Sequence, residues 1–193
     1  MQIKFPTTLY VILAALTLQG CAAAIVGGAA ATATIIHDRR TTGVIVEDQS
    51  IELKSYDVLK KDPMIKEQTN ISVTSYNMVV LLTGQATNEN LRRKAEQLVT
   101  GVDRVRRVVN EIEIGSTSSI GEDSRDVALT SEVKLKLSSI DIPGFDPLRV
   151  KVVTERGTVF LLGLITKQEG DAVTEVVRHI SGVRRVVRVF EYI

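Results

Sequence analysis

The sequence predicts an α+β fold of two small tandem domains, each with the order α-β-β-α-β and a three-stranded mixed sheet covered by two helices on one face. Three observations support this prediction. The length of 193 residues accommodates one ordinary domain or two small ones. A composition of 44% hydrophobic and 24% charged residues is that of a folded chain, neither disordered nor a polytopic membrane protein. Helix-type and strand-type hydrophobic spacings also occur twice in the same order.

Two segments of the chain repeat each other. Residues 71–84 match residues 150–163 at a constant offset of 79, and residues 101–108 match residues 182–189 at an offset of 81. The difference predicts a two-residue insertion in the later helix of the second unit. Each unit has about 68 residues, a size at which a single core is marginal. We therefore expect the two units to pack on each other or on a membrane.

The first element of each unit is predicted to be an amphipathic helix. In the second unit Leu129, Val133 and Leu137 recur every four residues and form one apolar stripe. Asp126 precedes this stripe and is expected at the N-cap or in the first turn, where a carboxylate accepts hydrogen bonds from free backbone N–H groups. The first unit has the same pattern with Ser55 in the middle of the stripe, so its helix has the weaker apolar face.

A hairpin, a second helix and a last strand complete each unit. The hairpin turns are expected at residues 75–78 and 155–158, and Gly84 and Gly163 are expected to end the second strands. The second helices and last strands are predicted at residues 89–99 and 105–114 in the first unit, and at residues 169–180 and 186–193 in the second.

The N-terminus has the pattern of an export signal. Lys4 is the only charged residue among the first 37, and the apolar residues 9–18 lead into Leu18-Gln19-Gly20-Cys21. These four residues resemble the lipobox of bacterial lipoproteins. The resemblance implies cleavage before Cys21, a diacylglycerol on its sulfur and acylation of its new amine. Ala22 in place of Asp implies sorting to the outer membrane.

Several acyl chains would anchor the mature protein stably. The alternative is an uncleaved transmembrane anchor, because residues 5–36 carry no formal charge and are long enough to span a bilayer. Residues 22–34 are rich in Ala and Gly and only weakly apolar, which favours the lipoprotein.

The order of the elements and their duplication resemble the BON domain, a small α/β module of bacterial envelope proteins. The stretch from Gly163 to Val183, which leads into Gly-Val-x-Arg-Val, carries much of this resemblance. Two such units behind a lipobox resemble the dual BON-domain outer-membrane lipoprotein family. The resemblance covers nearly the whole chain and divides it into a lipoprotein signal peptide (1–20), lipidated Cys21 with a flexible tether (21–47), a first BON domain (48–115), a linker (116–125) and a second BON domain (126–193).

No arrangement of residues predicts an enzyme. One Cys and two His exclude a disulfide framework and Cys-rich metal sites, and no metalloprotease, nucleophile-elbow or phosphate-loop motif is present. His179 is expected as a cation near a helix C-terminus. The net charge of +1 and the absence of Trp argue against a nucleic-acid partner. We expect neither a cofactor nor a metal.

The candidate site is the loop of residues 138–147, which follows the first helix of the second unit. Two Pro and one Gly limit how this loop can tuck away its apolar side chains, and Lys and Arg flank it. An apolar tip beside cations suits an anionic membrane interface. The alternative is that Ile142 and Phe145 fold back over the core or the other unit. The predicted lipid-contacting residues are Val133, Lys134, Lys136, Leu137, Ile140, Ile142, Phe145, Arg149 and Lys151.

Arginines also gather before the last strand of each unit. We expect them to cap the preceding helix and to solvate a strand face, with contact to lipid phosphate or to an acidic partner as the alternative. The clusters are Arg104, Arg106 and Arg107 in the first unit, and Arg184, Arg185 and Arg188 in the second.

The leading hypothesis is a non-enzymatic, lipid-anchored outer-membrane protein that faces the periplasm. It would bind an anionic phospholipid membrane through its second BON domain and support envelope integrity. The resemblance implies the same, since BON domains are associated with phospholipid binding. The alternative is a periplasmic adaptor that binds a protein partner of an envelope assembly or protease. A third hypothesis, a hydrolase of envelope material, lacks a convergent nucleophile and base.

Overall fold

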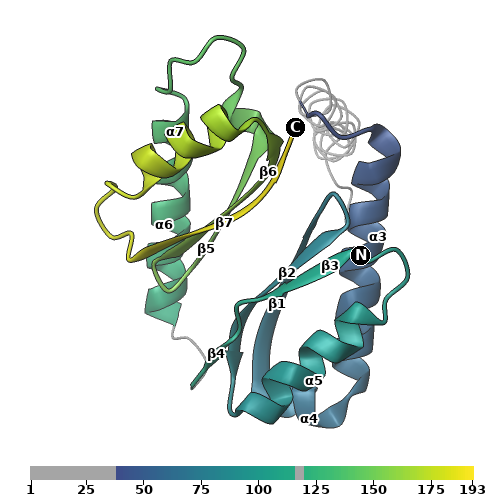
Figure 1. Cartoon of the computed structure of the whole chain (residues 1–193). Helices are drawn as coiled ribbons and strands as arrows, with labels where there is room; N and C mark the ends of the chain where they lie inside the picture. Colours follow the sequence, from purple (N-terminus) through teal and green to yellow (C-terminus); the bar gives the residue numbers. More distant parts are fainter. Residues whose placement is uncertain (1–37, 116–119) are drawn as a thin grey trace, which may run out of the picture. The chain divides into compact units, whose positions relative to one another are not determined.

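The computed structural model describes residues 38–115 and 120–193. Within them, Arg39–Ile193 is one compact unit, in which two copies of one fold follow each other (Figure 1). The predicted signal peptide, the lipidation site Cys21 and the tether up to residue 37 lie outside the described residues.

The first helix of the first domain begins inside the predicted tether. Thr41 is the N-cap of its first helix and accepts a hydrogen bond from Val44 N–H, so residues 42–47, which were assigned to the tether, are helical. Asp62 ends this helix and caps a short second one that was not predicted. The elements are α3 (Thr42–Lys61), α4 (Pro63–Gln68), β1 (Thr69–Tyr76), β2 (Val79–Ala86), α5 (Glu89–Thr100), β3 (Arg107–Asn110) and β4 (Glu113–Ile114).

The second domain repeats this order with a loop in place of α4. Its first helix starts at Ile120, inside the predicted linker, and its second helix is closed at the N-terminus by a capping box between Thr166 and Glu169. The elements are α6 (Ile120–Leu137), the 3₁₀ turn η1 (Pro147–Arg149), β5 (Val150–Glu155), β6 (Thr158–Ile165), α7 (Lys167–Val177) and β7 (Arg185–Tyr192).

The predicted mixed sheets are confirmed. The central strands β2 and β6 pair antiparallel with β1 and β5, and parallel with β3 and β7. The last strand of the first domain is broken: buried Ile112 separates β3 from β4, and its N–H donates to the side-chain oxygen of Asn110. The prediction of one strand over residues 105–114 therefore covered two short ones.

The register of the last strands corrects the repeat alignment. Val79 lies opposite Arg107, and Thr158 lies opposite Arg185. The last strands therefore correspond at an offset of 78, one less than the 79 that relates the hairpins, so the predicted two-residue insertion in the second helix is absent. The offset of 81 was wrong because Val and Arg recur every three residues in this stretch, so a shift of three still matches the same letters.

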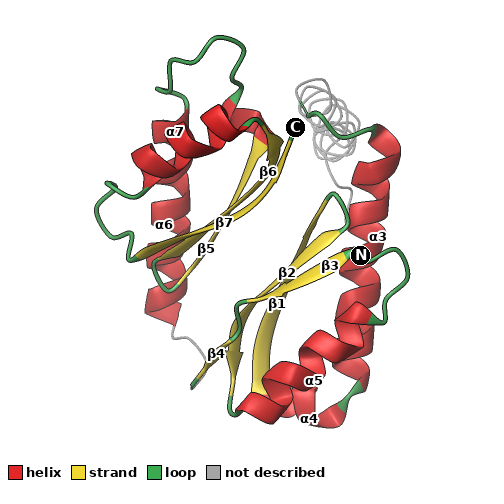
Figure 2. Ribbon diagram, viewed as in Figure 1, coloured by secondary structure: helices red, strands yellow, loops and turns green. Residues whose placement is uncertain are grey.

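Each sheet buries both of its faces. One face packs under the helices of its own domain (Figure 2), in the clusters around Ile51 and Val80 and around Val133 and Val159. The opposite faces share a third apolar cluster made of Tyr76, Val79, Leu81, Phe160, Leu162 and Val189. The expected packing of the two units on each other is therefore confirmed, and it explains why β2 and β6 are buried along almost their whole length.

Two further predictions need correction. Gly84 and Gly163 lie inside β2 and β6 rather than at their ends. A Cβ at Gly163 would approach the carbonyl oxygen of Arg149 to 2.8 Å, and one at Gly84 would collide with the carbonyl of Asn70, so close backbone approach requires glycine at both positions.

Asp126 lies well inside α6 and not at its N-cap. Its carboxylate accepts hydrogen bonds from the backbone N–H groups of Arg156 and Gly157 in the β5–β6 turn. Its counterpart Asp48 binds the N–H groups of Asn77 and Met78 in the same way. These carboxylates fix a hairpin turn to the first helix of each domain.

Candidate functional site

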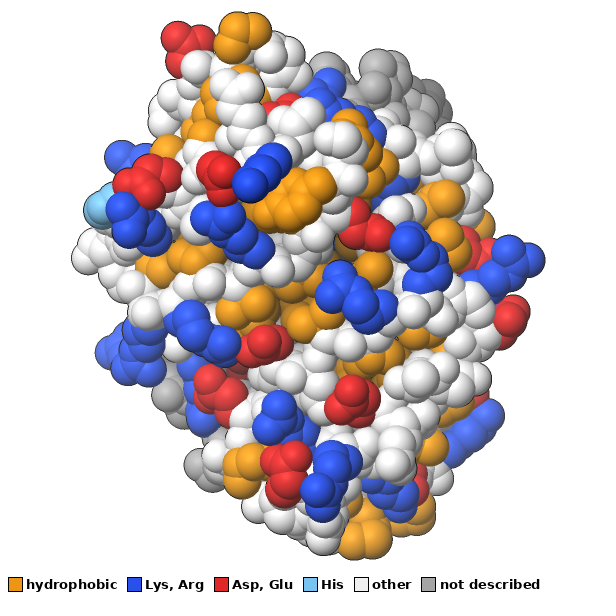
Figure 3. Space-filling model, viewed as in Figure 1, with side chains coloured by type: hydrophobic (Ala, Val, Ile, Leu, Met, Phe, Trp, Pro, Cys, Tyr) orange, Lys and Arg blue, Asp and Glu red, His pale blue; other side chains and the backbone are white. Residues whose placement is uncertain are grey.

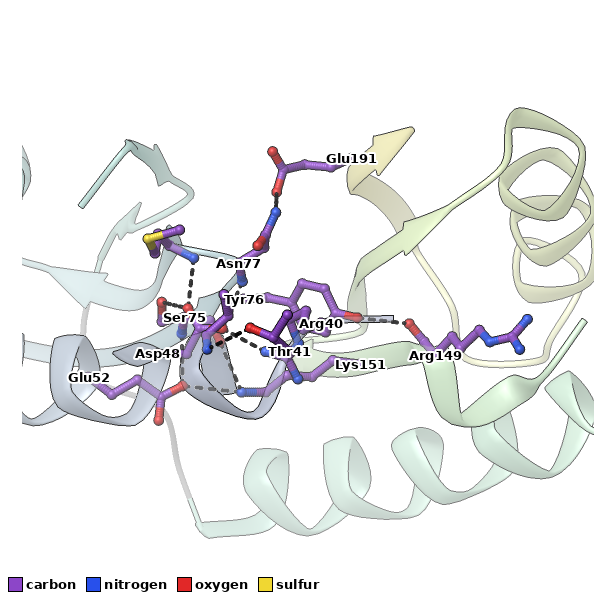
Figure 4. A network of polar contacts seen from close by, with 12 residues as sticks. Arg40, Thr41, Asp48, Glu52, Ser75, Tyr76, Asn77, Arg149, Lys151 and Glu191 are labelled. Atoms are coloured by element: carbon purple, nitrogen blue, oxygen red, sulfur yellow. Dashed lines mark hydrogen bonds and ion pairs between the residues drawn. The ribbon is translucent and has the colours of Figure 1, made fainter. Parts of the chain in front are cut away.

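A polar network joins the two domains beside the third apolar cluster (Figure 4). Lys151 of β5 donates to Glu52 of α3 at 3.1 Å, and the side chain of Asn77 donates to Glu191 of β7 at 2.7 Å. The hydroxyl of Tyr76 reaches the carbonyl oxygen of Arg149 at 3.4 Å. Lys151, which was predicted to contact lipid, therefore binds the first domain, and Glu191 had no predicted role.

Arg39 connects the start of the compact unit to the second domain. Its guanidinium binds both carboxylate oxygens of Glu169 at 2.8 and 2.9 Å and also donates to the carbonyl of Leu164. Glu169 has 5% of its side chain exposed. Burial raises the pKa of this carboxyl, but hydrogen bonds from Arg39 and from Thr166 outweigh it and hold the pKa below its usual range. Arg39, the first residue of the compact unit, is thus held on the second domain by an ion pair with the buried Glu169.

Two of the predicted lipid-contacting residues belong to the core. Val133 and Leu137 are 0% and 1% exposed, and they pack with Val159 and Val173 under the sheet. Their side chains hold α6 in place and do not reach the surface. The set of residues for direct lipid contact is therefore narrower than the sequence suggested.

The loop after α6 is partly folded back. Ile140 and Phe145 are half-buried against the core of the second domain, as the alternative interpretation expected of Phe145. Ile142 is half-exposed and lies outside that core cluster. Gly144, with φ of 79°, turns the chain at the tip, and its carbonyl accepts a 2.6 Å hydrogen bond from the Arg149 side chain.

The flanking cations divide into two groups. Lys151 is bound to Glu52, and Arg149 is bound to Gly144 and lies 3.7 Å from Glu169, so both have structural roles. Lys134 and Lys136 are exposed on the last turn of α6 and form no ion pair within the described part of the chain.

Sequence reasoning missed two apolar residues beside these lysines. Leu135 is 73% exposed on α6, and Leu148 is 55% exposed in η1. Leu135 is off the stripe formed by Leu129, Val133 and Leu137, which signals a residue that the core does not bury. Leu148 follows Pro147 directly and carried no periodic signal.

Three of the six clustered arginines form ion pairs with acidic residues of the described chain. Arg106 pairs with Glu191 and Arg185 pairs with Glu111, both between domains, whereas Arg188 pairs with Asp171 inside the second domain. Lys and Arg are interspersed with Asp and Glu over the face in Figure 3, without a large area of one sign. Net charge alone therefore selects no binding face.

His179 lies in the turn after α7, where its Nδ1 is 2.8 Å from the carbonyl oxygen of Glu175. Among residues 38–115 and 120–193, no three His, Cys, Asp or Glu side chains are grouped to hold a metal ion. No helix in the same residues is long and apolar enough to cross a membrane.

Three relatives resemble this chain over most of its length, and a family model described as "BON domain" matches residues 47–116 and 125–193. Outer membrane lipoprotein DolP of Haemophilus influenzae is 38% identical over 182 residues, covering 93% of this chain and 92% of that protein. The 21 kDa hemolysin of Actinobacillus pleuropneumoniae is 36% identical over 81% of this chain and 79% of its own. Osmotically-inducible protein Y of Escherichia coli K12 is 31% identical over 75% and 72%, respectively.

These matches include both domains described above, and the longest of them extends over 93% of the chain. The chain therefore belongs to the dual BON-domain outer-membrane lipoprotein family of the bacterial envelope.

Proposed function

We propose that this lipoprotein is anchored through Cys21, faces the periplasm, and binds anionic phospholipid through its second BON domain in support of envelope integrity. The observation that carries the proposal is a set of exposed cations and apolar side chains at one end of the second domain. We call this set, formed by Lys134, Leu135, Lys136, Ile142 and Leu148, the loop patch.

The loop patch has the composition of a membrane-interface site. Lys134 and Lys136 have no carboxylate partner in the described residues, so their charge is available to lipid phosphates. Leu135 and Leu148 expose most of their side chains to water, and burying apolar surface at a bilayer boundary is favourable. On the last turn of α6, Leu135 lies away from the buried Val133 and Leu137, and a lysine flanks it on either side.

The first domain lacks such a patch at the corresponding position. There α4 closes the connection between the first helix and the first strand, with Ile65 buried at 2% and only Met64 exposed at 50%. Asp62 caps α4 and pairs with Lys94, which lowers the pKa of the Asp62 carboxyl. This difference favours the second domain as the one that contacts lipid.

The Arg39–Glu169 pair supports the same assignment. It fixes the chain that leads back to Cys21 onto the second domain, close to Arg149 at the end of η1. The 18 residues from Cys21 to Arg39 span at most roughly 60 Å when fully extended. An acylated Cys21 would therefore keep the loop patch at high effective concentration near the bilayer.

Binding to vesicles tests the proposal. Unacylated residues 22–193 would be titrated with vesicles of phosphatidylglycerol and phosphatidylcholine at 1:3, and with phosphatidylcholine alone, while amide NMR signals are followed. We expect shifts at the loop patch with the anionic vesicles only. Replacing Lys134 and Lys136 by Gln should weaken binding by about 2 kcal/mol, or about 30-fold, since each Lys near an anionic surface contributes about 1 kcal/mol.

Two substitutions separate surface contact from folding. Ile142→Asp should abolish most of the binding with the fold retained, whereas Met64→Asp at the corresponding connection of the first domain should leave binding unchanged. Equal losses in both variants, or shifts that do not depend on phosphatidylglycerol, would contradict the proposal and favour the protein-partner alternative.

A further inference from the structure

A hollow of about 400 Å³ lies in the second domain beside the middle of α6, and none of the residues that line it belongs to the loop patch. Three segments surround it: α6, the β5–β6 turn at Arg156 and Gly157, and the turn after α7 at Gly182 and Arg184. Neither the fold nor the proposed membrane contact makes use of this hollow.

Two glycines with positive φ line the hollow, Gly157 at 74° and Gly182 at 91°. A Cβ at Gly157 would lie 3.2 Å from the Arg184 side chain, so the open space is at Gly182. By strand register their counterparts in the first domain are Met78 and Arg104, which adopt φ of 62° and 69° with full side chains. The correspondence is supported by one shared hydrogen bond: Arg184 N–H donates to the Gly157 carbonyl, as Arg106 N–H donates to the Met78 carbonyl.

The side chains at this place differ between the two domains. Met78 packs against the core of the first domain, and Ile51 beneath it is 0% exposed. In the second domain Leu129 takes the place of Ile51 and remains 8% exposed at the floor of the hollow. A Cβ added at Gly182 would meet only the Leu129 methyl groups, at 3.9 and 4.0 Å, so this part of the floor is open.

Three guanidinium groups surround this apolar floor: Arg125, Arg156 and Arg184. In the described residues the side chains of Arg125 and Arg184 have no hydrogen-bond or ion-pair partner. Two carboxylates also line the hollow. Asp126 accepts from the turn amides of residues 156 and 157, which occupies it, and Glu132 lies farther along α6. The three arginines outnumber the two lining carboxylates by one, and Arg156 also pairs with Glu113 at 3.9 Å, so Arg125 and Arg184 are the cations available to a ligand.

We propose that this hollow binds an organic phosphate: a phosphate group held by the arginines, with a short carbon body lying on Leu129. Guanidinium groups match phosphate oxygens in a bidentate manner and bind them through charge-assisted hydrogen bonds. Arginines from three separate segments suit a group with several acceptor oxygens. The proposal does not depend on membrane binding by the loop patch, since the two sites share no residue.

The test uses the full acylated chain in a non-ionic detergent, with glycerol 3-phosphate as the probe. We expect saturable NMR shifts at the amides of Gly157, Ser181 and Gly182 and none at Ile142 or Leu148. Arg125→Glu combined with Arg184→Glu should raise the dissociation constant at least tenfold. Both side chains are exposed, so the fold should survive, and the unshifted signals of the first domain check this.

Two further variants serve as controls for phosphate binding in the hollow. Arg104→Glu reverses an exposed arginine of the first domain and should leave the affinity unchanged, whereas Gly182→Arg introduces the side chain found there and should block the hollow. Shifts that survive the double variant, or equal affinity for inorganic phosphate and glycerol 3-phosphate, would overturn the proposal.

A second arm identifies the source of the phosphate. Nanodiscs containing phosphatidylglycerol that shift the same three amides at lower concentration than glycerol 3-phosphate would assign the group to a lipid headgroup; stronger shifts with the soluble phosphate would assign it to a free metabolite. A peptide with a C-terminal carboxylate that binds more tightly than either would overturn the phosphate assignment in favour of a protein partner.

Discussion

The two BON domains share one fold but differ in the connection after the first helix and in the side chains at two turn positions. In the first domain α4 seals the connection after the first helix, and Met78 and Arg104 occupy the turn positions with positive φ. In the second domain the same connection is an open loop, and glycines occupy the corresponding turn positions at Gly157 and Gly182. The comparison teaches that a duplicated fold can keep one copy closed while the other exposes a surface patch and a hollow.

The largest expected difference in stability comes from the carboxylate that joins the first helix to the hairpin turn, because Asp48 has more binding partners than Asp126. Asp48 is 3% exposed and binds Arg40, Ser75 and two turn amides, whereas Asp126 is half-buried and is bound by two turn amides. We expect Asp48→Ala to lower the free energy of unfolding by about 3–5 kcal/mol, the cost of breaking a buried ion pair. Asp126→Ala should cost about 1–3 kcal/mol, the cost of leaving backbone N–H groups unsatisfied. Urea unfolding of both variants measures the difference, and equal losses would contradict it.

Substitution by Ala in the central position of the first helix's apolar stripe should change the free energy of unfolding in opposite directions in the two domains. Val133 is fully buried, and truncation to Ala should cost about 1.5–3 kcal/mol of unfolding free energy. Its counterpart Ser55 is also fully buried, and its hydroxyl has no hydrogen-bond partner among the described residues. Ser55→Ala should therefore stabilise the first domain by about 0.5–1 kcal/mol, because it removes an unsatisfied polar group and favours the helix. Thermal unfolding of the pair checks this, and a loss of stability in Ser55→Ala would show that its hydroxyl has a partner.

The Arg39–Glu169 pair predicts a dependence on pH. The pKa of Glu169 is lower in the folded protein than in the unfolded chain, so its contribution is fully present above the ordinary carboxyl pKa and is lost as pH falls through the lowered value. At pH 7, Glu169→Gln should lower the unfolding free energy by about 1.5–3 kcal/mol, the range for hydrogen bonds to charged groups.

Chemical denaturation of wild type and Glu169→Gln from pH 7 to pH 3 measures this contribution. The two curves of stability against pH should converge as the pH falls from the ordinary carboxyl pKa through the lowered pKa of Glu169 in the folded protein. A constant gap across this range would show that Glu169 contributes through packing and not through its charge.

The exposed ion pair of α7 should have the smallest effect. The Glu175 carboxylate is hydrogen-bonded by Arg178, which lowers its pKa, but both side chains are more than half exposed. Glu175→Gln should leave the unfolding free energy nearly unchanged, since exposed ion pairs are screened by water and salt. A larger loss in thermal unfolding would indicate a role for this residue beyond the surface pair.

Part of the candidate site could be predicted from the sequence. The loop of residues 138–147 and its lysines were identified from composition alone, because Pro, Gly and isolated apolar residues after a helix predict a surface segment. The roles of Arg149 and Lys151 were not predictable, since their partners Gly144 and Glu52 depend on distances that arise only after folding. The burial of Val133 and Leu137 was implicit in their spacing, which predicts a core stripe at least as well as a lipid-facing one.

The sequence by itself determined the duplicated α-β-β-α-β order and the mixed sheets, because period and turn chemistry are local properties of the chain. Only the tertiary structure decided that the two sheets share an apolar cluster, that Asp48 and Asp126 hold hairpin turns and not helix ends, and that Gly182 faces an open hollow over Leu129. The physical reason is that each of these features depends on which residues meet across elements, and hydrophobic spacing specifies the buried face of an element but not its partner.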